Sequence, residues 1–240
     1  MNDVLFSRAG MLSANPGSAS FSRHAADTVS VGGRSVRVDL YEPEVPVDAG
    51  MVLLLHGVGG LLGDGSMMRR AARFFAGRGF RAGVAHYFNA TGTFFATQAN
   101  ARQHVGEWRR AILEVARVYT LHGPVGMLGY SLGGALAVGV AQEVAGINAV
   151  AVMSAGVLED HEPLVPSHTP ALFVLHGGQD PKVPPEHAEA LARLGRHAGM
   201  LVESVIYPHE GHSFGSRAER DAFTRTAEFF AARLETGAEP

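Results

Sequence analysis

The chain of 240 residues contains no cysteine, which excludes disulfides, thiolate metal sites and a cysteine nucleophile together. Its net charge is only −3 at pH 7, so it lacks the basic surface that binding to nucleic acid or anionic membrane requires. Long hydrophobic runs are also missing. No stretch approaches the roughly 20 apolar residues of a membrane-spanning helix, and the start of the chain lacks the apolar core of a signal peptide. The sequence therefore predicts a cytoplasmic protein without a nucleic-acid or membrane partner.

The composition is typical of a folded domain. Hydrophobic residues make up 46% of the chain and charged residues 18%, with a mean hydropathy of +0.07. These values exclude intrinsic disorder, which needs low hydrophobicity and high net charge. Residues 1–23 are rich in Ser, Ala, Gly and Asn without a clear period, so we expect a loosely ordered N-terminal extension. Residues 24–240 contain no linker, repeat or change of composition, which predicts one domain.

Two short strands around Gly32-Gly33 open this domain. Residues 34–41 alternate apolar and polar side chains, the period of a half-buried strand, and the Gly-Gly pair permits a tight turn after residues 28–31. Beyond this hairpin, continuous apolar runs alternate with segments of helical period. The expected strands are 51–55, 80–87, 125–129, 149–153, 171–175 and 201–207, and the expected helices are 66–78, 97–119, 132–145, 185–197 and 218–234.

This alternation predicts an α/β fold in which a mostly parallel central sheet has helices on both faces. The opening hairpin is expected to form an antiparallel edge of that sheet. Because the carboxyl ends of parallel strands meet at one edge, residues that follow those strands are expected to lie close together.

The most informative segment is Gly129-Tyr130-Ser131-Leu132-Gly133-Gly134, where an apolar strand passes directly into a helix. A serine at such a junction sits on a tight, strained turn with its hydroxyl exposed at the edge of the sheet. Flanking glycines are needed because side chains there would collide with the neighbouring strand and helix. The backbone N–H of Leu132, at the start of the helix, can point at a developing oxyanion. The segment predicts a nucleophilic serine at position 131.

A serine hydroxyl needs a base to take its proton, and in hydrolases with this strand–turn–helix arrangement the acid and the histidine follow in that order. His212 lies between the last predicted strand and the last predicted helix, and Asp180 follows the strand before them. Alone, Asp180 is better explained as a turn or N-cap carboxylate; together with Ser131 and His212 it completes a triad. His209 is the alternative base. A zinc site is disfavoured because His209 and His212 are spaced three residues apart rather than four.

The loop His56-Gly57-Val58-Gly59-Gly60 directly follows the first apolar strand. Its glycines let the backbone approach a substrate closely, and the N–H of Val58 is the candidate second oxyanion donor. A purely structural glycine turn is the alternative, and a phosphate loop is disfavoured by the spacing. His56 and His176 each end a strand before a glycine, and we interpret both as structural hydrogen-bonding residues.

With Ser131, Asp180, His212 and the His56-Gly57 loop in this order, the chain resembles the α/β-hydrolases, and more narrowly the dienelactone hydrolase family. The similarity runs from about residue 35 to residue 231. The resemblance implies an α/β-hydrolase fold, and since only residues 155–170 are available where lids usually enter, no large cap domain is expected.

The chain departs from that family in two respects. The enzymes that give the family its name use a cysteine nucleophile, whereas position 131 is serine. They also hold a substrate carboxylate with an arginine after the strand that ends near Tyr87, and residues 86–91 contain none. Arg217 is a possible replacement cation of uncertain register. The resemblance therefore implies a neutral ester rather than a lactone that bears a carboxylate.

The pocket is expected to be shallow and open. The residues predicted to line it are Tyr130, Tyr87, Phe88 and Phe214, with Val58, Phe94, Phe95 and Leu158 beside them. For Phe94 and Phe95, packing of the following helix into the core is an alternative explanation.

The predicted activity is hydrolysis of small carboxylic esters or lactones through an acyl-enzyme, without a cofactor or metal. A thioesterase or small peptidase with the same triad is one alternative. A binding protein that keeps the fold without catalysis is another. The sequence leaves open the natural substrate, its chain length and stereochemistry, and whether the protein is a monomer or a homodimer.

Overall fold

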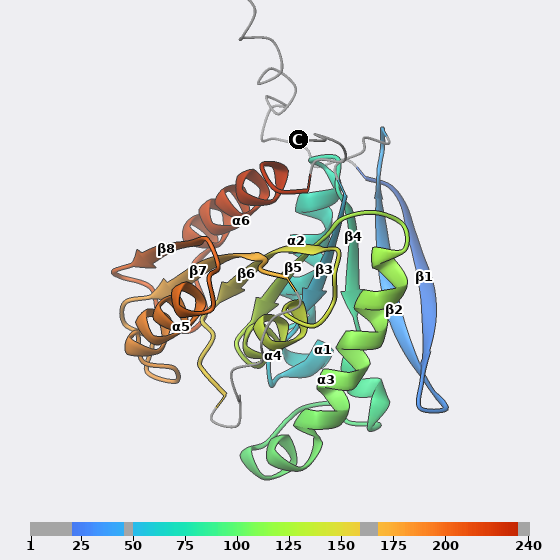
Figure 1. Ribbon diagram of the computed structural model, residues 1–240, viewed down its shortest axis with the longest axis horizontal. Helices are drawn as coiled ribbons and strands as arrows, with labels where there is room; N and C mark the ends of the chain where they lie inside the picture. The colour runs from blue at the N-terminus through green and yellow to red at the C-terminus, as the bar shows by residue number, and fades with distance from the viewer. Residues whose placement is uncertain (1–20, 46–49, 159–167, 235–240) are drawn as a thin grey trace, which may run out of the picture.

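The computed structural model describes residues 21–45, 50–158 and 168–234 (Figure 1). Its strands are β1 (Phe21–Val31), β2 (Arg34–Pro43), β3 (Met51–Leu55), β4 (Arg81–Ala85), β5 (Val125–Tyr130), β6 (Ile147–Met153), β7 (Ala171–Gly177) and β8 (Val202–Tyr207). Its helices are α1 (Gly60–Gly63), α2 (Gly65–Ala76), the 3₁₀ helix η1 (Tyr87–Ala90), α3 (Gln98–Thr120), α4 (Leu132–Ala141), α5 (Glu186–His197) and α6 (Ser216–Ala231).

The strands form one eight-stranded sheet in the order β1-β2-β4-β3-β5-β6-β7-β8. β2 pairs antiparallel with both β1 and β4, and every other pairing is parallel. Gly32 and Gly33 make the hairpin turn with φ angles of 56° and 80°, which glycine adopts without steric cost. The predicted parallel sheet with an antiparallel edge hairpin is confirmed.

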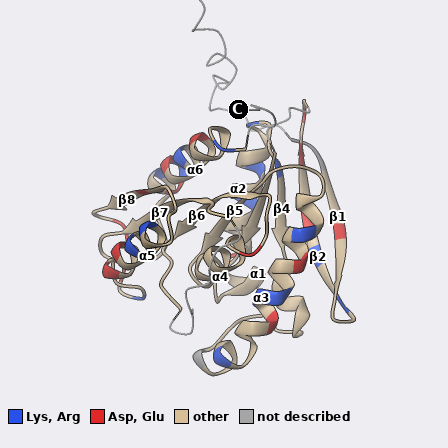
Figure 2. Cartoon of the chain, in the orientation of Figure 1, with Lys and Arg blue, Asp and Glu red and all other residues tan. Residues whose placement is uncertain are grey.

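Helices cover both faces of the sheet. Side chains of α3, α4 and α5 belong to one buried apolar cluster, and side chains of α2 and α6 belong to a second cluster on the other face. Figure 1 shows these helices on opposite sides of the strands. The strands β3 and β7 are buried along their whole length, which explains their continuous apolar sequences. Charged side chains lie mainly on the outer helices and the edge hairpin (Figure 2).

Several predicted boundaries differ from the structure. β4 ends at Ala85 rather than at residue 87 because the chain turns into η1. α4 ends at Ala141 rather than at residue 145, and β1 begins at Phe21, inside the segment predicted as an extension. The rest of that predicted extension, residues 1–20, lies outside the described residues. α3 begins at Gln98, one residue after the predicted start, because the Thr97 side chain caps the helix by accepting a hydrogen bond from Asn100 N–H in a capping box.

The connection from β6 to β7 spans residues 154–170, so the fold has no large cap domain at this position. Residues 159–167 of that connection are not among those described. Within the described part of the chain, no helix combines the length and the apolar character needed to cross a membrane.

Candidate active site

Ser131 lies at the junction of β5 and α4 with φ 51° and ψ −120°. A positive φ in a residue with a side chain costs free energy, and such strain persists where the surrounding structure enforces it. Here a Cβ at Gly129 would collide with the first turn of α4, and a Cβ at Gly133 would collide with the backbone at the end of β3. The two glycines allow strand and helix to approach closely, and this close approach holds the serine at the carboxyl edge of the sheet.

Three side chains from separate loops meet at this edge. His212 Nε2 lies 3.1 Å from Ser131 Oγ, and His212 Nδ1 lies 2.7 Å from Asp180 Oδ2. All three residues are buried, with exposed fractions of 8% for Ser131, 4% for Asp180 and 9% for His212. The arrangement can pass the hydroxyl proton to the imidazole while the carboxylate holds the imidazole in one tautomer.

Asp180 also serves as the turn residue that its sequence context favours. Its Oδ1 accepts hydrogen bonds from the N–H groups of Lys182 at 2.9 Å and Val183 at 3.0 Å. Burial by itself would raise the pKa of Asp180, but these N–H groups and His212 favour the charged form and lower the pKa overall. One carboxylate therefore makes both the turn and the contact to the imidazole, and it stays ionised in mildly acidic solution.

The other histidines considered at these loops have different surroundings. His176 is fully buried, and its Nε2 donates to the carbonyl of Val183 at 2.8 Å, which fastens the loop that carries Asp180. His209 is exposed, whereas His212 is the histidine beside Ser131. Among the described residues, no group of three His, Cys, Asp or Glu side chains is arranged to hold a metal ion.

The loop after β3 packs against the serine. A Cβ built on Gly57 would lie 3.1 Å from Ser131 Cβ, so the two backbones are in close contact. The carbonyl of Gly57 accepts hydrogen bonds from Gly60 N–H at 3.1 Å and from His56 Nδ1 at 2.9 Å. Because the peptide is planar and trans, fixing this carbonyl also fixes the direction of the Val58 N–H on the opposite side.

The structural role of His56 predicts how stability changes with pH. Burial lowers the pKa of His56 from 6.5 to about 4, although its hydrogen bond to Gly57 partly opposes this change. The unfolded chain therefore binds a proton at higher pH than the folded chain does, and stability falls as the pH drops from 6.5 towards 4. We expect His56 to account for a loss of about 2 kcal/mol in the free energy of unfolding between pH 7 and pH 5.

Urea unfolding of wild type and His56→Asn at both pH values measures this contribution. Asparagine can keep the hydrogen bond to Gly57 but does not titrate. The variant should be less stable than wild type at pH 7. Its free energy of unfolding should change by about 2 kcal/mol less than that of wild type between pH 7 and pH 5. Equal pH dependence in the two proteins would show that His56 is not the group responsible.

The structure corrects two residues predicted to line the pocket. Tyr87 is fully buried, and its hydroxyl donates to the carbonyl of His56 at 2.7 Å while the two rings stack 4.2 Å apart. Phe88 is 3% exposed and packs against Trp108, with ring centroids 4.2 Å apart. Both side chains turn inward from η1, so they support the His56 loop from beneath instead of facing a substrate.

Tyr130 and Phe214, the other two predicted lining residues, border a cavity that none of Ser131, Asp180 and His212 lines. The Tyr130 hydroxyl lies 3.3 Å from the carbonyl of His212 and 3.1 Å from Ser213 Oγ, so it also anchors the histidine loop. The cavity has a volume of about 190 Å³. Its lining residues are Gly63, Asp64, Ser66, Met67, Arg70, Tyr130, Met153, Ser213, Phe214 and Glu219.

Asp64 is a site residue that the sequence analysis missed. Its carboxylate lies beneath the loop after β3, where a Cβ on Gly57 would be 3.0 Å from Oδ2 and a Cβ on Gly59 would be 2.8 Å from Oδ1. Asp64 Oδ2 is buried and has no hydrogen-bond partner among the described residues. Burial raises the pKa of Asp64, while the N–H groups of Gly57 and Gly59 and the charge of His212 oppose that rise. The only sequence signal was a lone carboxylate between two glycines.

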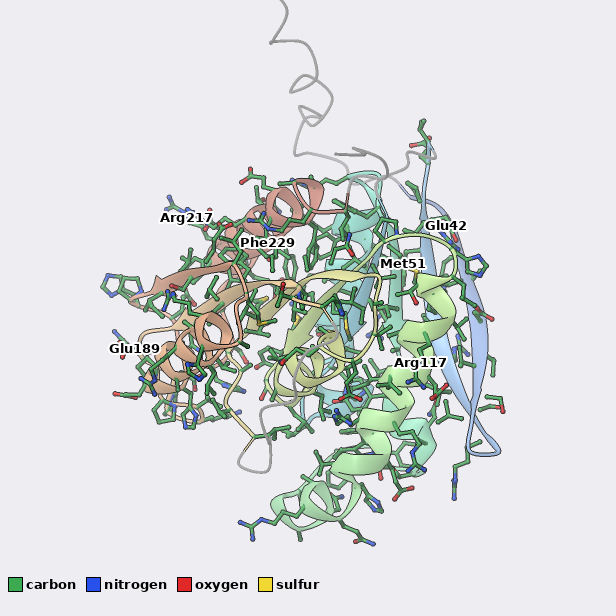
Figure 3. All side chains as sticks on the ribbon, in the orientation of Figure 1. Glu42, Met51, Arg117, Glu189, Arg217 and Phe229 are labelled. Atoms are coloured by element: carbon green, nitrogen blue, oxygen red, sulfur yellow. The ribbon has the colours of Figure 1, made fainter. Side chains whose placement is uncertain are left out.

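Arg217, considered as a cation for the substrate, is exposed on the first turn of α6 and projects outward (Figure 3). Its charge acts on Asp221, one turn further along the same helix. Arg70 lines the cavity, but both of its hydrogen bonds, each 2.7 Å long, go to Glu219. The charge of Arg70 is therefore already balanced within the protein.

The sequence was also compared with models of protein families and with curated protein sequences. The model of the dienelactone hydrolase family matches residues 36–234. No curated protein sequence matches the chain.

Solved structures share the fold at low sequence identity. A putative dienelactone hydrolase from Klebsiella pneumoniae is 17% identical with a TM-score of 0.69, and the match covers 88% of this chain and 99% of that one. A dienelactone hydrolase-like promiscuous phosphotriesterase from metagenomic libraries is 19% identical with a TM-score of 0.74, covering 89% and 100%. A thermostable esterase from Pseudomonas putida is 17% identical with a TM-score of 0.73, covering 95% and 88%.

Proposed function

Because the chain belongs to the dienelactone hydrolase family, we propose that it hydrolyses neutral carboxylic esters with Ser131 as the nucleophile. The chain is a hydrolase that acts on ester bonds. The observation that carries the finer proposal is the continuous contact from Ser131 Oγ to His212 Nε2 at 3.1 Å and from His212 Nδ1 to Asp180 Oδ2 at 2.7 Å. A serine hydroxyl becomes a competent nucleophile only when such a base is within reach.

In the first half of the reaction, Ser131 Oγ attacks the ester carbonyl carbon and its proton moves to His212 Nε2. Asp180 stabilises the resulting imidazolium without taking the proton itself. The negative oxygen of the tetrahedral intermediate lies between the N–H groups of Val58 and Leu132, each of which contributes about 3 kcal/mol to its stabilisation. The intermediate then collapses, the alkoxide leaves with the proton from His212, and an acyl-serine remains.

In the second half, His212 takes a proton from water as the water oxygen attacks the acyl carbon. A second tetrahedral intermediate forms in the same oxyanion site. Its collapse releases the carboxylic acid and returns the proton from His212 to Ser131 Oγ. The cycle regenerates the starting enzyme and uses only these side chains and water.

The charges around the cavity favour a neutral substrate. Its lining contains two carboxylates, Asp64 and Glu219, and one cation, Arg70, which is paired with Glu219. Any part of a substrate that carried a carboxylate into this cavity would meet uncompensated negative charge at Asp64. This balance supports a neutral ester over a lactone with a free carboxylate.

Parallel assays of one short acyl group as p-nitrophenyl ester, acyl-thioester and aminoacyl amide test the reaction type. We expect the ester to be hydrolysed with the highest kcat/KM. A faster thioester or amide would instead assign a thioesterase or peptidase with the same triad. Absence of turnover on all three, in folded protein, would favour the non-catalytic binding function.

A further inference from the structure

The cavity lined by Tyr130 and Phe214 is too small to hold a whole substrate of ordinary size, and none of Ser131, Asp180 and His212 lines it. Its volume of about 190 Å³ is below the roughly 300–1,000 Å³ of pockets that enclose small-molecule ligands. A substrate of ordinary size must therefore extend over the surface of the protein next to the serine.

The reaction geometry separates the alcohol part of the ester from its acyl part. The leaving oxygen receives its proton from His212, so the alcohol part of the ester lies on the histidine side. The acyl chain lies on the other side of the scissile carbonyl. The loop that carries Val58 packs against Ser131 through Gly57, so its surface is within reach of an acyl chain bound to the serine.

Large apolar side chains are exposed on and beside the loop that carries Val58. We call them the apolar rim: Val58 is 45% exposed, Leu62 78%, Phe94 72% and Phe95 58%. They come from two neighbouring segments: the loop after β3 with α1, and the segment between η1 and α3. Isolated exposed apolar residues are common, but a group of them around a reactive centre marks a binding surface.

The two segments of the apolar rim are held together beside the serine. Ala96 N–H donates to the Val58 carbonyl at 2.6 Å, and the backbone of Phe94 lies directly against Gly60. Asn100, in the first turn of α3, donates from its side chain to the Phe95 carbonyl at 3.3 Å. The rim is therefore continuous with the loop whose Gly57 touches Ser131, and its backbone is fixed by hydrogen bonds.

We propose that the apolar rim binds the acyl chain of the substrate, which makes the preferred substrates esters of medium-chain or aromatic carboxylic acids. This inference rests on the proposed serine esterase activity. An acyl chain that crosses Val58 reaches the two phenylalanines and removes apolar surface from water on both partners. An acetyl group is too short to reach them, so the rim should affect long acyl groups and leave acetate unaffected.

The test compares p-nitrophenyl acetate and p-nitrophenyl octanoate in wild type and in the double variant Phe94→Ser/Phe95→Ser. We expect kcat/KM for octanoate to fall about 10–100-fold, mainly through KM, and kcat/KM for acetate to stay within about twofold. The variant Phe94→Tyr/Phe95→Tyr keeps the aromatic surface and should restore octanoate hydrolysis. Leu121→Ser is the matched control, because Leu121 is 81% exposed but follows α3 at the opposite edge of the sheet.

The outcomes separate this inference from the function on which it rests. If wild type hydrolyses both esters and the serine double variant changes their ratio no more than Leu121→Ser does, the apolar rim does not bind the acyl chain. If the double variant converts a dimer to a monomer in sedimentation with an unchanged ratio, the rim is an interface between two copies, which also overturns the inference. If wild type hydrolyses neither ester, the proposed function itself fails.

Discussion

Replacing Ser131 with alanine is expected to lower kcat/KM for ester substrates by about 10⁴–10⁶-fold, the loss seen when a triad nucleophile is removed. The fold should be unchanged, because the hydroxyl is hydrogen-bonded to the imidazole of His212 and the strained backbone is imposed by Gly129 and Gly133. Steady-state kinetics with a p-nitrophenyl ester measures the loss, and circular dichroism checks the fold.

The chain supplies a matched control for this substitution. Ser154 follows β6 with φ 50°, and in the described residues it and Ser131 are the only non-glycine residues with positive φ. Ser154 is fully buried, and its Oγ has no hydrogen-bond partner among the residues that the structure describes. Ser154→Ala therefore removes a hydroxyl from an equally strained backbone and should change kcat/KM by less than about threefold. A comparable loss in both variants would mean that Ser131 acts through the fold.

The second large effect is expected at Asp180. In Asp180→Asn, the amide oxygen can still accept from the N–H groups of Lys182 and Val183, which turns the amide NH₂ towards His212. An NH₂ group donates to Nδ1, so the proton of the neutral imidazole moves to Nε2, where it faces Ser131 Oγ. The base is then in the wrong tautomer to accept the hydroxyl proton, and kcat should fall about 10⁴-fold.

A second substitution at the same position separates the contribution of Asp180 to catalysis from its contribution to the stability of the turn. Asp180→Ala removes both the contact to His212 and the two turn hydrogen bonds. It should therefore lower the free energy of unfolding by about 1–3 kcal/mol in addition to the loss of activity, whereas Asp180→Asn should retain nearly wild-type stability. Urea unfolding of both variants measures this difference. An active Asp180→Asn together with an unstable Asp180→Ala would make Asp180 a turn residue only.

The residues of the candidate triad could be predicted because each depends on local sequence and chain order. The Gly-x-Ser-x-Gly segment specifies its own tight turn, and parallel strands bring the loops that follow them to the same edge. Asp180 and His212 each follow a strand that the apolar periodicity reveals. The parallel sheet was predictable for the same reason, although the ends of β4 and α4 were not, since they depend on how the chain turns afterwards.

The directions of the side chains around the site could not be predicted in this way. Tyr87 ends an apolar run at the correct edge of the sheet, but η1 turns it beneath His56, and only the tertiary structure shows this. Asp64 belongs to no recognisable pattern and becomes a site residue because the chain folds back beneath Gly57. Phe94 and Phe95 suited either a pocket or the core, and the start of α3 after Thr97 leaves them exposed.

The most direct test of the account is to treat the full chain with a fluorophosphonate and locate the adduct by peptide mass spectrometry. The probe forms a covalent bond only with a serine whose proton a neighbouring base can take. We predict one adduct, on Ser131, with labelling abolished in Ser131→Ala and strongly slowed in Asp180→Asn. Folded protein that stays unlabelled, or that carries the adduct on a different serine, would contradict the claim that His212 and Asp180 activate Ser131.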